Sequence, residues 1–431
     1  MNLYTVKSGD SLFSISREFG VPAGLIAVWN AISPPYILVV GQCLLILTPE
    51  RLYTAVRGDT YSSVAEKNGI TERELFSNNP NLYGGAAILY EGQTLVISFA
   101  EKPSSSIRMN GYAYTYIEPR ILSYSLPYLS YLTPFTYGFR ENGNLVNLDD
   151  EALISAAEDF GVAPLMHLST LTENGTFSSE RASVLFRSPA AMENLANNIV
   201  ATIQQKSYSG LDIDFEFIPS ENAADYAMFI ERLRNLLNPL GYPVIAALAP
   251  KTSADQSGVL YEGHDYSLIG AAANAVLIMT YEWGYTYGPP MAVAPIPAVR
   301  RVLDYAVSEI SPSKIFMGLP NYAYDWILPY KQGYTRATLI GNDEAVGIAR
   351  RFGAEIKFDE TAKTPYFNYY LNGNTHEVWF EDVRSMREKF ALITEYGFAG
   401  GGYWNMMRKF DQGFLLQNVT FSLDMSPKVI F

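Results

Sequence analysis

Three acidic residues alternate with apolar residues in the run Asp212-Ile213-Asp214-Phe215-Glu216. If this run is a β-strand, its three carboxyl groups point to one face at intervals of about 6–7 Å. The bulky apolar residues between and around them indicate that both faces of the strand are buried. Burying three like charges in a row is costly, so at least one carboxyl is expected to hold a proton at neutral pH. Perturbed carboxyl groups of this kind are typical of sites that transfer protons.

The elements around this run predict an α/β protein. β-like runs occur at residues 109–114, 131–136, 163–168, 210–218, 244–249, 275–281, 315–320 and 399–404. Helical patterns lie between most of them, at residues 151–160, 189–206, 223–237, 296–309 and 380–396. Eight strands with intervening helices predict a (β/α)8 TIM barrel, a fold that typically takes about 250 residues. A doubly wound α/β sheet is the alternative, but no glycine-rich phosphate loop opens it.

The acidic run lies on the fourth strand of this predicted barrel. Catalytic groups in such barrels come from the C-terminal ends of the strands. We therefore expect Glu216 to lie nearest the mouth, Asp214 one layer below it, and Asp212 deeper still.

The segment between the seventh and eighth predicted strands is longer than one helix requires. Residues 342–352 are helical, and three short strand-like runs follow, two of them joined by the hairpin signal Asn372-Gly373. We predict a small α+β insertion at about residues 328–380, within a domain that spans residues 108–431.

The first hundred residues contain a repeat. The run Tyr4-Thr5-Val6-Lys7-Ser8-Gly9-Asp10 recurs as Tyr53-Thr54-Ala55-Val56-Arg57-Gly58-Asp59. Each copy begins and ends with a β-like run and has two short helical patterns between them, a βααβ layout. We predict a first module at residues 1–49, a second module at residues 50–99, and a polar linker at residues 100–107.

Both modules resemble LysM, a module that binds polysaccharides built on N-acetylglucosamine, such as peptidoglycan and chitin. The resemblance rests on the opening Tyr-x-Val-x-x-Gly-Asp and the closing Gly-Gln-x-Leu-x-Ile, with Ala55-Val56 replacing a single Val in the second copy. It implies a sugar groove between the first strand–helix loop and the loop after the second helix. The residues implied to bind glycan are Gly9, Asp10, Ser11, Asn30 and Ile32 in the first module, and Gly58, Asp59, Thr60, Asn79 and Asn81 in the second.

The large domain resembles glycoside hydrolase family 18. Residues 209–216 match the family signature Asp-x-x-Asp-x-Asp-x-Glu, except that Ser209 stands in the place of the first Asp. Met279-Thr280-Tyr281-Glu282 and Gly401-Gly402-Tyr403-Trp404 match two further family motifs at the ends of strands six and eight. One departure lies on strand three, where Ser169-Thr170-Leu171 stands for the Ser-x-Gly-Gly of many members.

This resemblance implies a cleavage in which the 2-acetamido oxygen of the sugar attacks its own anomeric carbon. Glu216 would protonate the leaving oxygen and then activate water, Asp214 would hold the acetamido N–H, and Asp212 would share a proton with Asp214. Tyr281 would donate its hydroxyl to the acetamido carbonyl, and Trp404 would form the floor of the pocket. The other residues implied to bind substrate are Met279, Glu282, Trp283, Tyr112, Tyr137 and Asn321.

Composition narrows the possible partners. The formal net charge of −13 argues against nucleic acid, and no apolar run is long enough to span a membrane. The only cysteine is Cys43, and His167, His264 and His376 match no metal-ligand spacing. We therefore expect no metal and no other cofactor, and a monomer.

Two glycan-binding modules joined to such a barrel are similar to the spore-associated cell-wall hydrolases of endospore formers. The N-terminus lacks the basic and apolar regions of a secretory signal. We expect synthesis in the cytoplasm without a signal peptide and a place at the boundary of spore coat and cortex. The implied activity is cleavage after N-acetylglucosamine in spore-cortex peptidoglycan. Two alternatives stay open: a chitinase or chito-oligosaccharide hydrolase, and a non-catalytic wall-binding coat protein.

Overall fold

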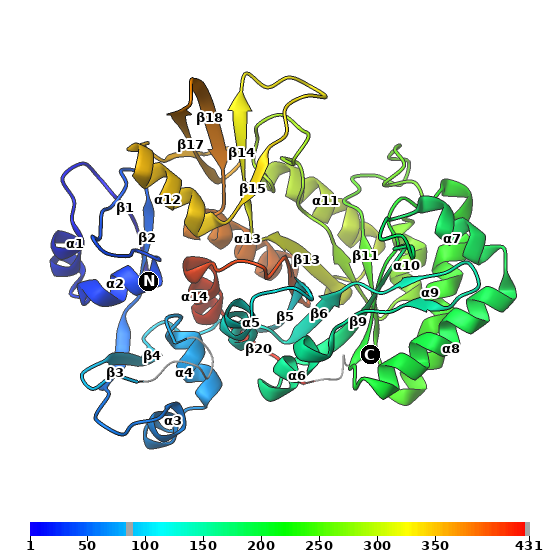
Figure 1. Cartoon of the computed structure of the whole chain (residues 1–431), viewed down its shortest axis with the longest axis horizontal. Coiled ribbons are helices and arrows are strands. Elements are labelled where there is room, and N and C mark those ends of the chain that lie inside the picture. Colours follow the sequence, from blue (N-terminus) through cyan, green and yellow to red (C-terminus); the bar gives the residue numbers. More distant parts are fainter. Residues whose placement is uncertain (83–88, 427–431) are drawn as a thin grey trace.

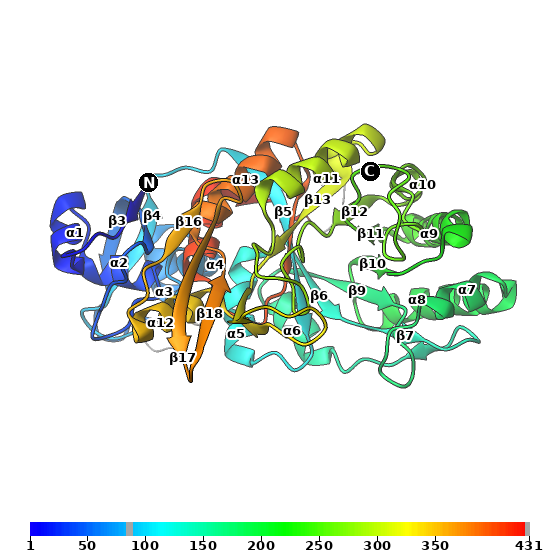
Figure 2. The same cartoon turned by 90° about the horizontal axis from the view of Figure 1, so that it is seen from above.

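The computed structural model describes residues 1–82 and 89–426, so the last five residues of the predicted domain 108–431 lie outside it. Within the described residues, eight parallel strands close into a barrel (Figures 1 and 2). Pairing of β19 with both β13 and β5 completes the closure, which confirms the predicted (β/α)8 barrel. The barrel strands are β5 (Ser105–Tyr114), β6 (Tyr131–Phe135), β9 (Ala163–Ser169), β10 (Gly210–Asp214), β11 (Val244–Leu248), β12 (Ala275–Ile278), β13 (Ile315–Pro320) and β19 (Gly400–Trp404).

Helices surround this barrel and bury one apolar face each. On α9, for example, Tyr226, Phe229, Ile230 and Leu233 recur at helical spacing, and all are buried. The surrounding helices are α5 (Pro119–Ser125), α6 (Glu151–Asp159), α7 (Ser179–Phe186), α8 (Pro189–Gln205), α9 (Ala223–Leu237), α10 (Tyr266–Ala272), α11 (Ile296–Glu309), α13 (Val383–Tyr396) and α14 (Asp411–Thr420). The short strands β7 (Gly138–Phe139) and β8 (Leu145–Val146) form a hairpin, and β20 (Phe421–Leu423) pairs with β5 outside the barrel.

Two barrel strands end well before their predicted last residues. β10 stops at Asp214 instead of residue 218, and β12 stops at Ile278 instead of residue 281. In both places the chain soon enters a left-handed conformation, with φ of +57° at Phe217 and +68° at Glu282. The early ends let the chain leave the sheet, so that the segments after both strands reach the mouth of the barrel.

The predicted insertion between the seventh and eighth strands is present and forms its own antiparallel sheet with one helix. It starts at Ala323, earlier than the predicted residue 328. The reason is that only Asn321 and Tyr322 separate β13 from β14, so no loop in the sequence marks the boundary. Its elements are β14 (Ala323–Leu328), β15 (Thr338–Ile340), α12 (Asn342–Phe352), β16 (Lys357–Asp359), β17 (Thr364–Leu371) and β18 (Asn374–Trp379).

Each N-terminal module has the predicted βααβ layout, with its two strands paired antiparallel. Ser11 and Thr60 cap the first helix of their modules, and each forms a capping box with a serine three residues later. The last predicted linker residues, from Ser105 on, belong to β5. The elements are β1 (Asn2–Thr5), α1 (Leu12–Phe19), α2 (Ala23–Trp29), β2 (Cys43–Ile46), β3 (Pro49–Thr54), α3 (Tyr61–Asn68), α4 (Glu72–Asn78) and β4 (Thr94–Phe99).

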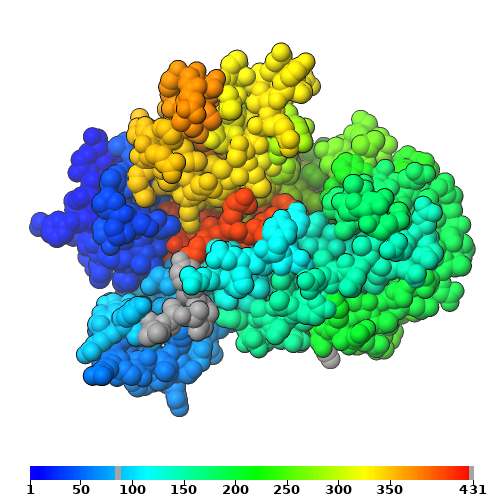
Figure 3. Space-filling view, in the orientation of Figure 1, coloured from blue at the N-terminus to red at the C-terminus, as the bar shows by residue number. Residues whose placement is uncertain are grey.

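Both modules pack directly on the barrel domain. Figure 3 shows the first module beside the insertion, and the second module beneath it next to the barrel. Helix α14 lies between the barrel and the modules, where Gln412 donates a hydrogen bond to Asn30 (2.7 Å) and Asn418 donates one to Asn78 (2.8 Å). Leu415 of the same helix is fully buried.

Candidate active site

The three acidic residues lie together at the mouth of the barrel. Asp212 and Asp214 are inside β10 and buried, whereas Glu216 lies two residues beyond the strand end and is half-buried. Asp214 and Glu216 line a pocket of about 340 Å³ at this mouth. The three acids therefore lie in the expected order along the strand, with Glu216 nearest the mouth, Asp214 below it and Asp212 deepest.

Asp212 is the deepest carboxyl group of the three. Its Oδ2 accepts a hydrogen bond of 2.6 Å from the Tyr112 hydroxyl, and its Oδ1 has no hydrogen-bond partner among the described residues. Burial raises the pKa of Asp212 to about 7, although the Tyr112 hydroxyl acts in the opposite direction. Asp212 therefore exchanges its proton near neutral pH.

Asp214 lies between the other two acids. Burial, together with the charges of Glu216 and Asp212, raises the pKa of Asp214 well above its usual value. His167 approaches it from behind, with 3.7 Å between Nε2 and Asp214 Oδ2. Burial lowers the pKa of His167 to about 3, so this imidazole is neutral and adds no positive charge. The carboxyl groups are left to share protons with one another.

Glu216 faces a second acidic residue across the pocket. Burial and the charge of Glu282 raise the pKa of Glu216, which keeps it protonated at higher pH than an exposed glutamate. The hydroxyls of Tyr322 and Tyr324 both donate hydrogen bonds to the Glu282 carboxylate, the second at 3.2 Å. Glu282 is therefore held in place by Tyr324 of the insertion and by Tyr322, which directly precedes the insertion. A protonated carboxyl at the pocket wall can act as a general acid.

Hydrogen bonds to the backbone of Phe215 hold the turn that carries Glu216. The Phe215 N–H donates to the Tyr226 hydroxyl (3.3 Å), and its carbonyl lies 2.9 Å from His264 Nε2. Because the Ala249 N–H donates to His264 Nδ1, the imidazole proton is on Nε2 and points to this carbonyl. Burial lowers the pKa of His264 to about 4, so this arrangement persists at neutral pH.

Tyr281 forms the opposite wall of the pocket. Burial and the neighbouring acids raise the pKa of Tyr281 well above its usual value, so its hydroxyl remains a proton donor. Gly318 lies against its ring, and a Cβ at Gly318 would be 2.7 Å from Tyr281 Cε1. The close contact with this glycine positions the ring.

Trp404 lies at the C-terminal end of β19 and forms the floor. Its ring contacts Tyr112, Tyr114 and Phe135, with centroid separations between 5.0 and 6.0 Å. Of the residues predicted to bind substrate, the pocket is lined by Tyr112, Met279, Tyr281, Glu282, Trp283 and Trp404.

Two residues predicted to bind substrate have structural positions instead. Tyr137 is buried outside the pocket, where its hydroxyl donates to Asp150 (2.6 Å). Asn321 is buried as well, and its Nδ2 donates to the carbonyls of Asn405 and Arg408, both at 3.0 Å. Asn321 thus supports the loop after Trp404 and does not line the pocket.

Several residues of the pocket wall were not predicted from the sequence. Tyr114 and Phe135 lie at the ends of predicted strands, and their aromatic character at those positions was an available signal. Loop residues had no comparable signal, because loop length and sequence pattern do not determine where a side chain points. The missed loop residues are Phe177, Phe217, Pro250, Leu260 and Tyr261.

The predicted glycan-binding residues of the two modules divide into two groups. Asn30, Ile32 and Asn79 are buried, which contradicts a direct role in an open groove. Asn30 and Asn79 instead bridge the end of a helix to a strand: Asn30 Nδ2 donates to the carbonyls of Ile26 and Leu45, and Asn79 makes the equivalent bonds. The exposed members of the predicted set are Gly9, Ser11, Gly58, Thr60 and Asn81.

Asp10 and Asp59 organise the loops in which they lie. Asp10 accepts hydrogen bonds from the Tyr4 hydroxyl (2.8 Å) and the Lys7 N–H (2.7 Å). Asp59 accepts the corresponding bonds from Tyr53 and Val56. Each aspartate therefore shapes its loop and leaves Gly9 or Gly58 at the surface.

Among residues 1–82 and 89–426, no group of three or more His, Cys, Asp or Glu side chains is arranged to hold a metal ion. No helix in the described part of the chain is long and apolar enough to cross a membrane.

Comparison with known families agrees with this arrangement. The model of the glycosyl hydrolases of family 18 matches residues 112–408, and the LysM domain model matches residues 4–46 and 53–98. These matches cover the barrel with its acidic run and both N-terminal modules.

Similar proteins extend over nearly the whole chain. The chain is 37% identical to the cortical fragment-lytic enzyme of Bacillus subtilis (strain 168) over 98% of its length and 99% of that protein. It is 35% identical to the protein of the same name from Bacillus anthracis, over 97% and 99% of the two chains. Its structure superposes on the crystal structure of the Bacillus megaterium QM B1551 spore cortex-lytic enzyme SleL with a TM-score of 0.83, 37% identity, and coverage of 98% and 99%.

Proposed function

Because this chain belongs to the glycosyl hydrolases of family 18, we propose that it cleaves spore-cortex peptidoglycan after N-acetylglucosamine. Two observations support this substrate. The chain carries two LysM domains, and full-length relatives are cortical fragment-lytic enzymes. The enzyme works as a monomer at the spore cortex, since one chain contains the barrel, the catalytic pocket and both wall-binding modules.

The observation that carries the mechanism is the buried acid row, with Tyr281 and Trp404 in the same pocket. The 2-acetamido oxygen of the bound sugar attacks its own anomeric carbon, while protonated Glu216 gives its proton to the leaving oxygen. Asp214 accepts a hydrogen bond from the acetamido N–H and stabilises the oxazolinium ion. Asp212 takes up the proton that Asp214 releases. Ionised Glu216 then activates water to open the oxazolinium ring.

Tyr281 and Trp404 position the acetamido group in this mechanism. The Tyr281 hydroxyl stays protonated and donates to the acetamido carbonyl, which holds the oxygen in line with the anomeric carbon. Trp404 packs under the sugar and its methyl group. The cleaved sugar therefore needs an N-acetyl group, because no protein carboxylate takes the role of nucleophile.

The decisive experiment is to measure the masses of products released from purified cortex fragments by the native chain and by Glu216→Gln. We expect products with N-acetylglucosamine at the new reducing end, and a loss of turnover by orders of magnitude in the variant. Near-normal turnover of Glu216→Gln would show that Glu216 is not the proton donor to the leaving oxygen. Faster cleavage of chitin oligomers than of cortex fragments would instead identify a chitinase or chito-oligosaccharide hydrolase.

A further inference from the structure

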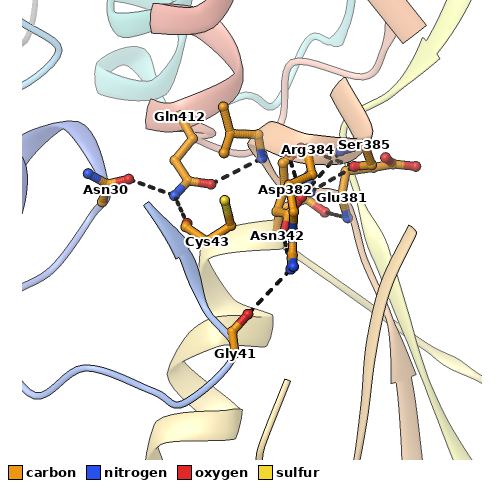
Figure 4. A network of polar contacts seen from close by, with 10 residues as sticks. Asn30, Gly41, Cys43, Asn342, Glu381, Asp382, Arg384, Ser385 and Gln412 are labelled. Atoms are coloured by element: carbon orange, nitrogen blue, oxygen red, sulfur yellow. Dashed lines mark hydrogen bonds and ion pairs between the residues drawn. The ribbon is translucent and has the colours of Figure 1, made fainter. Parts of the chain in front are cut away.

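The loop before the second strand of the first module lies directly on the insertion. In this loop, residues 33–42, the Val40 carbonyl accepts a hydrogen bond from the Ile356 N–H (2.9 Å). Gly41 is so close to the insertion that a Cβ would lie 1.8 Å from the Ile356 carbonyl oxygen. The Gly41 carbonyl accepts a hydrogen bond from Arg384 of α13 (3.4 Å), as Figure 4 shows. Because only glycine fits at position 41, the backbone of the loop itself forms the contact.

The corresponding loop of the second module is described at residues 89–93. Val39 and Tyr90 occupy corresponding positions, and each N–H donates to a glutamine side chain three residues later at 3.2 Å. Val39 is only 5% exposed and packs in the apolar cluster of the insertion, whereas Tyr90 is 73% exposed. Gly92, the counterpart of Gly41, has φ of +85° against +82°, and no described atom lies within 4 Å of a Cβ placed there. The backbone geometry therefore belongs to the module, and the burial of Val39 and Gly41 is due to the insertion.

The apolar core of the first module is continuous with that of the barrel. Ile26, Trp29 and Leu44 of the module are buried in the same cluster of apolar side chains as Leu415 and Leu416 of α14. Strand β2 contacts α13 and α14, and helix α2 contacts α14. Movement of the module away from the barrel would therefore expose apolar surface of both partners to water.

Polar contacts accompany this shared core. Gln412 of α14 donates from its Nε2 to the Asn30 side chain and to the Cys43 carbonyl, both at 2.7 Å (Figure 4). The Cys43 thiol lies at the same junction, beside the N-terminus of α13. Burial and the charge of Asp382, the N-cap of α13, raise the pKa of this thiol to about 12. Cys43 therefore marks the interface from the side of the module.

Two buried polar atoms at this junction have no hydrogen-bond partner among the described residues, namely Asn342 Nδ2 and Glu381 Oε1. Both residues line a cavity of about 10 Å³, which is about the space of one water molecule. Their other polar atoms are paired, since Asn342 Oδ1 accepts from the Glu381 N–H (2.9 Å) and Glu381 Oε2 accepts from Lys389 (2.8 Å). Both unpaired atoms belong to the catalytic domain and not to the module.

The second module is attached in a different way. Most of its core is a separate apolar cluster that includes Val64, Leu75 and Ile97. Arg73 of α4 reaches the barrel domain, where its guanidinium donates to the carbonyls of Pro127 (3.1 Å) and Leu129. The second module therefore provides matched controls for the contacts of the first.

We infer that the first module is a fixed wall of the catalytic domain rather than an anchor that swings on a linker. Domains move relative to one another by default unless their interface is large and apolar, and a shared apolar core removes that freedom. The exposed loop with Gly9 and Ser11 consequently keeps one orientation relative to the catalytic pocket. The use of this orientation to align a glycan rests on the proposed function, whereas the fixed seat does not.

Cys43, the only cysteine of the chain, reports on this seat. In the full chain, we expect a disulfide reagent such as 5,5′-dithiobis(2-nitrobenzoic acid) to label Cys43 at least about a hundredfold more slowly than in the urea-unfolded chain, because the thiol is buried and its pKa is high. Gly41→Ala should raise the rate of labelling in the folded chain about tenfold, because the added Cβ collides with the insertion and favours local opening. Gly92→Ala has the same backbone strain without the collision and should leave the rate unchanged.

Hydrogen exchange of the Ile356 amide tests the same contact from the side of the insertion. We expect Gly41→Ala to lower protection of this amide about tenfold and Gly92→Ala to leave it unchanged. If Gly41→Ala does not fold, Val39→Ser against Tyr90→Ser makes the same comparison in both assays.

Equal labelling and equal protection within the measured pair would overturn the inference, as would labelling of the native chain at the rate of the unfolded chain. Neither assay depends on hydrolysis. Failure of the chain to cleave cortex fragments would contradict the proposed function and leave this result unaffected, so the two failures are distinguishable.

Discussion

Asp212→Asn should stabilise the protein above neutral pH while impairing its catalysis. The buried carboxyl of Asp212 has a pKa of about 7, compared with 3.8 in an exposed aspartate. As pH rises from 3.8 to about 7, the unfolded chain gains the negative charge and the folded chain does not. Stability that is fully present below pH 3.8 is therefore lost progressively up to pH 7. Asparagine does not titrate, and its side-chain oxygen still accepts a hydrogen bond from the Tyr112 hydroxyl.

The size of this effect follows from the pKa of the buried group. A difference between 3.8 and about 7 corresponds to about 4 kcal/mol over the whole range, at 1.36 kcal/mol for each pKa unit. Between pH 5 and pH 8, only the interval from pH 5 to about 7 lies within this range. That interval of about two pH units corresponds to about 3 kcal/mol. The gain of Asp212→Asn over the native chain should grow by this amount between the two pH values.

Urea denaturation of both chains at pH 5 and pH 8 measures the difference, with free energies of unfolding taken from linear extrapolation. Asp424→Asn is a control that should show no change between these two pH values, because Ser426 and the Arg108 guanidinium lower the pKa of Asp424 below 3.8 despite its partial burial. Its difference in stability from the native chain should therefore be the same at pH 5 and at pH 8. If the native chain and Asp212→Asn change in parallel with pH, the reasoning about the acid row is wrong.

Three further results are expected. Tyr281→Phe removes the donor to the acetamido carbonyl and should lower kcat about 10²–10³-fold, so a fall of less than threefold would contradict its role. Glu282→Gln removes the negative charge beside Glu216 and lowers the pKa of Glu216. The high-pH limb of kcat/KM should then move to lower pH, and a limb that stays in place would exclude this coupling. Binding of Glu216→Gln to insoluble cortex should depend on sugars and resist salt at the net charge of −13, so strong release by moderate salt in a pelleting assay would argue for electrostatic attachment.

The fold was predictable wherever a regular pattern spans a whole element. Helices α9, α11 and α12 have the predicted bounds, because their apolar residues recur at one helical period between clear ends. The predicted strand of residues 210–218 was too long, since the exit of the chain after Asp214 has no local sequence signal. The start of the insertion was missed for the same reason.

The candidate site shows a similar division. Asp212, Asp214 and Glu216 could be named from their alternation on one strand, and Tyr281 and Trp404 from the family motifs that residues 279–282 and 401–404 resemble. The residues that support Glu216 could not be predicted, because Tyr226 on the following helix and His264 in a loop farther along the chain contact the backbone of Phe215 only in the folded protein.

The sequence by itself determined the chemistry and the periodicities: an acid row on one strand, aromatic strand ends, and a module repeated twice. These features are local, so side-chain type and spacing suffice to read them. Only the tertiary structure decided that Tyr112 bonds Asp212, that Tyr324 of the insertion bonds Glu282, and that Gly41 contacts Ile356. Such contacts join residues from distant parts of the chain, and they depend on closure of the barrel and on close packing, which no local pattern encodes.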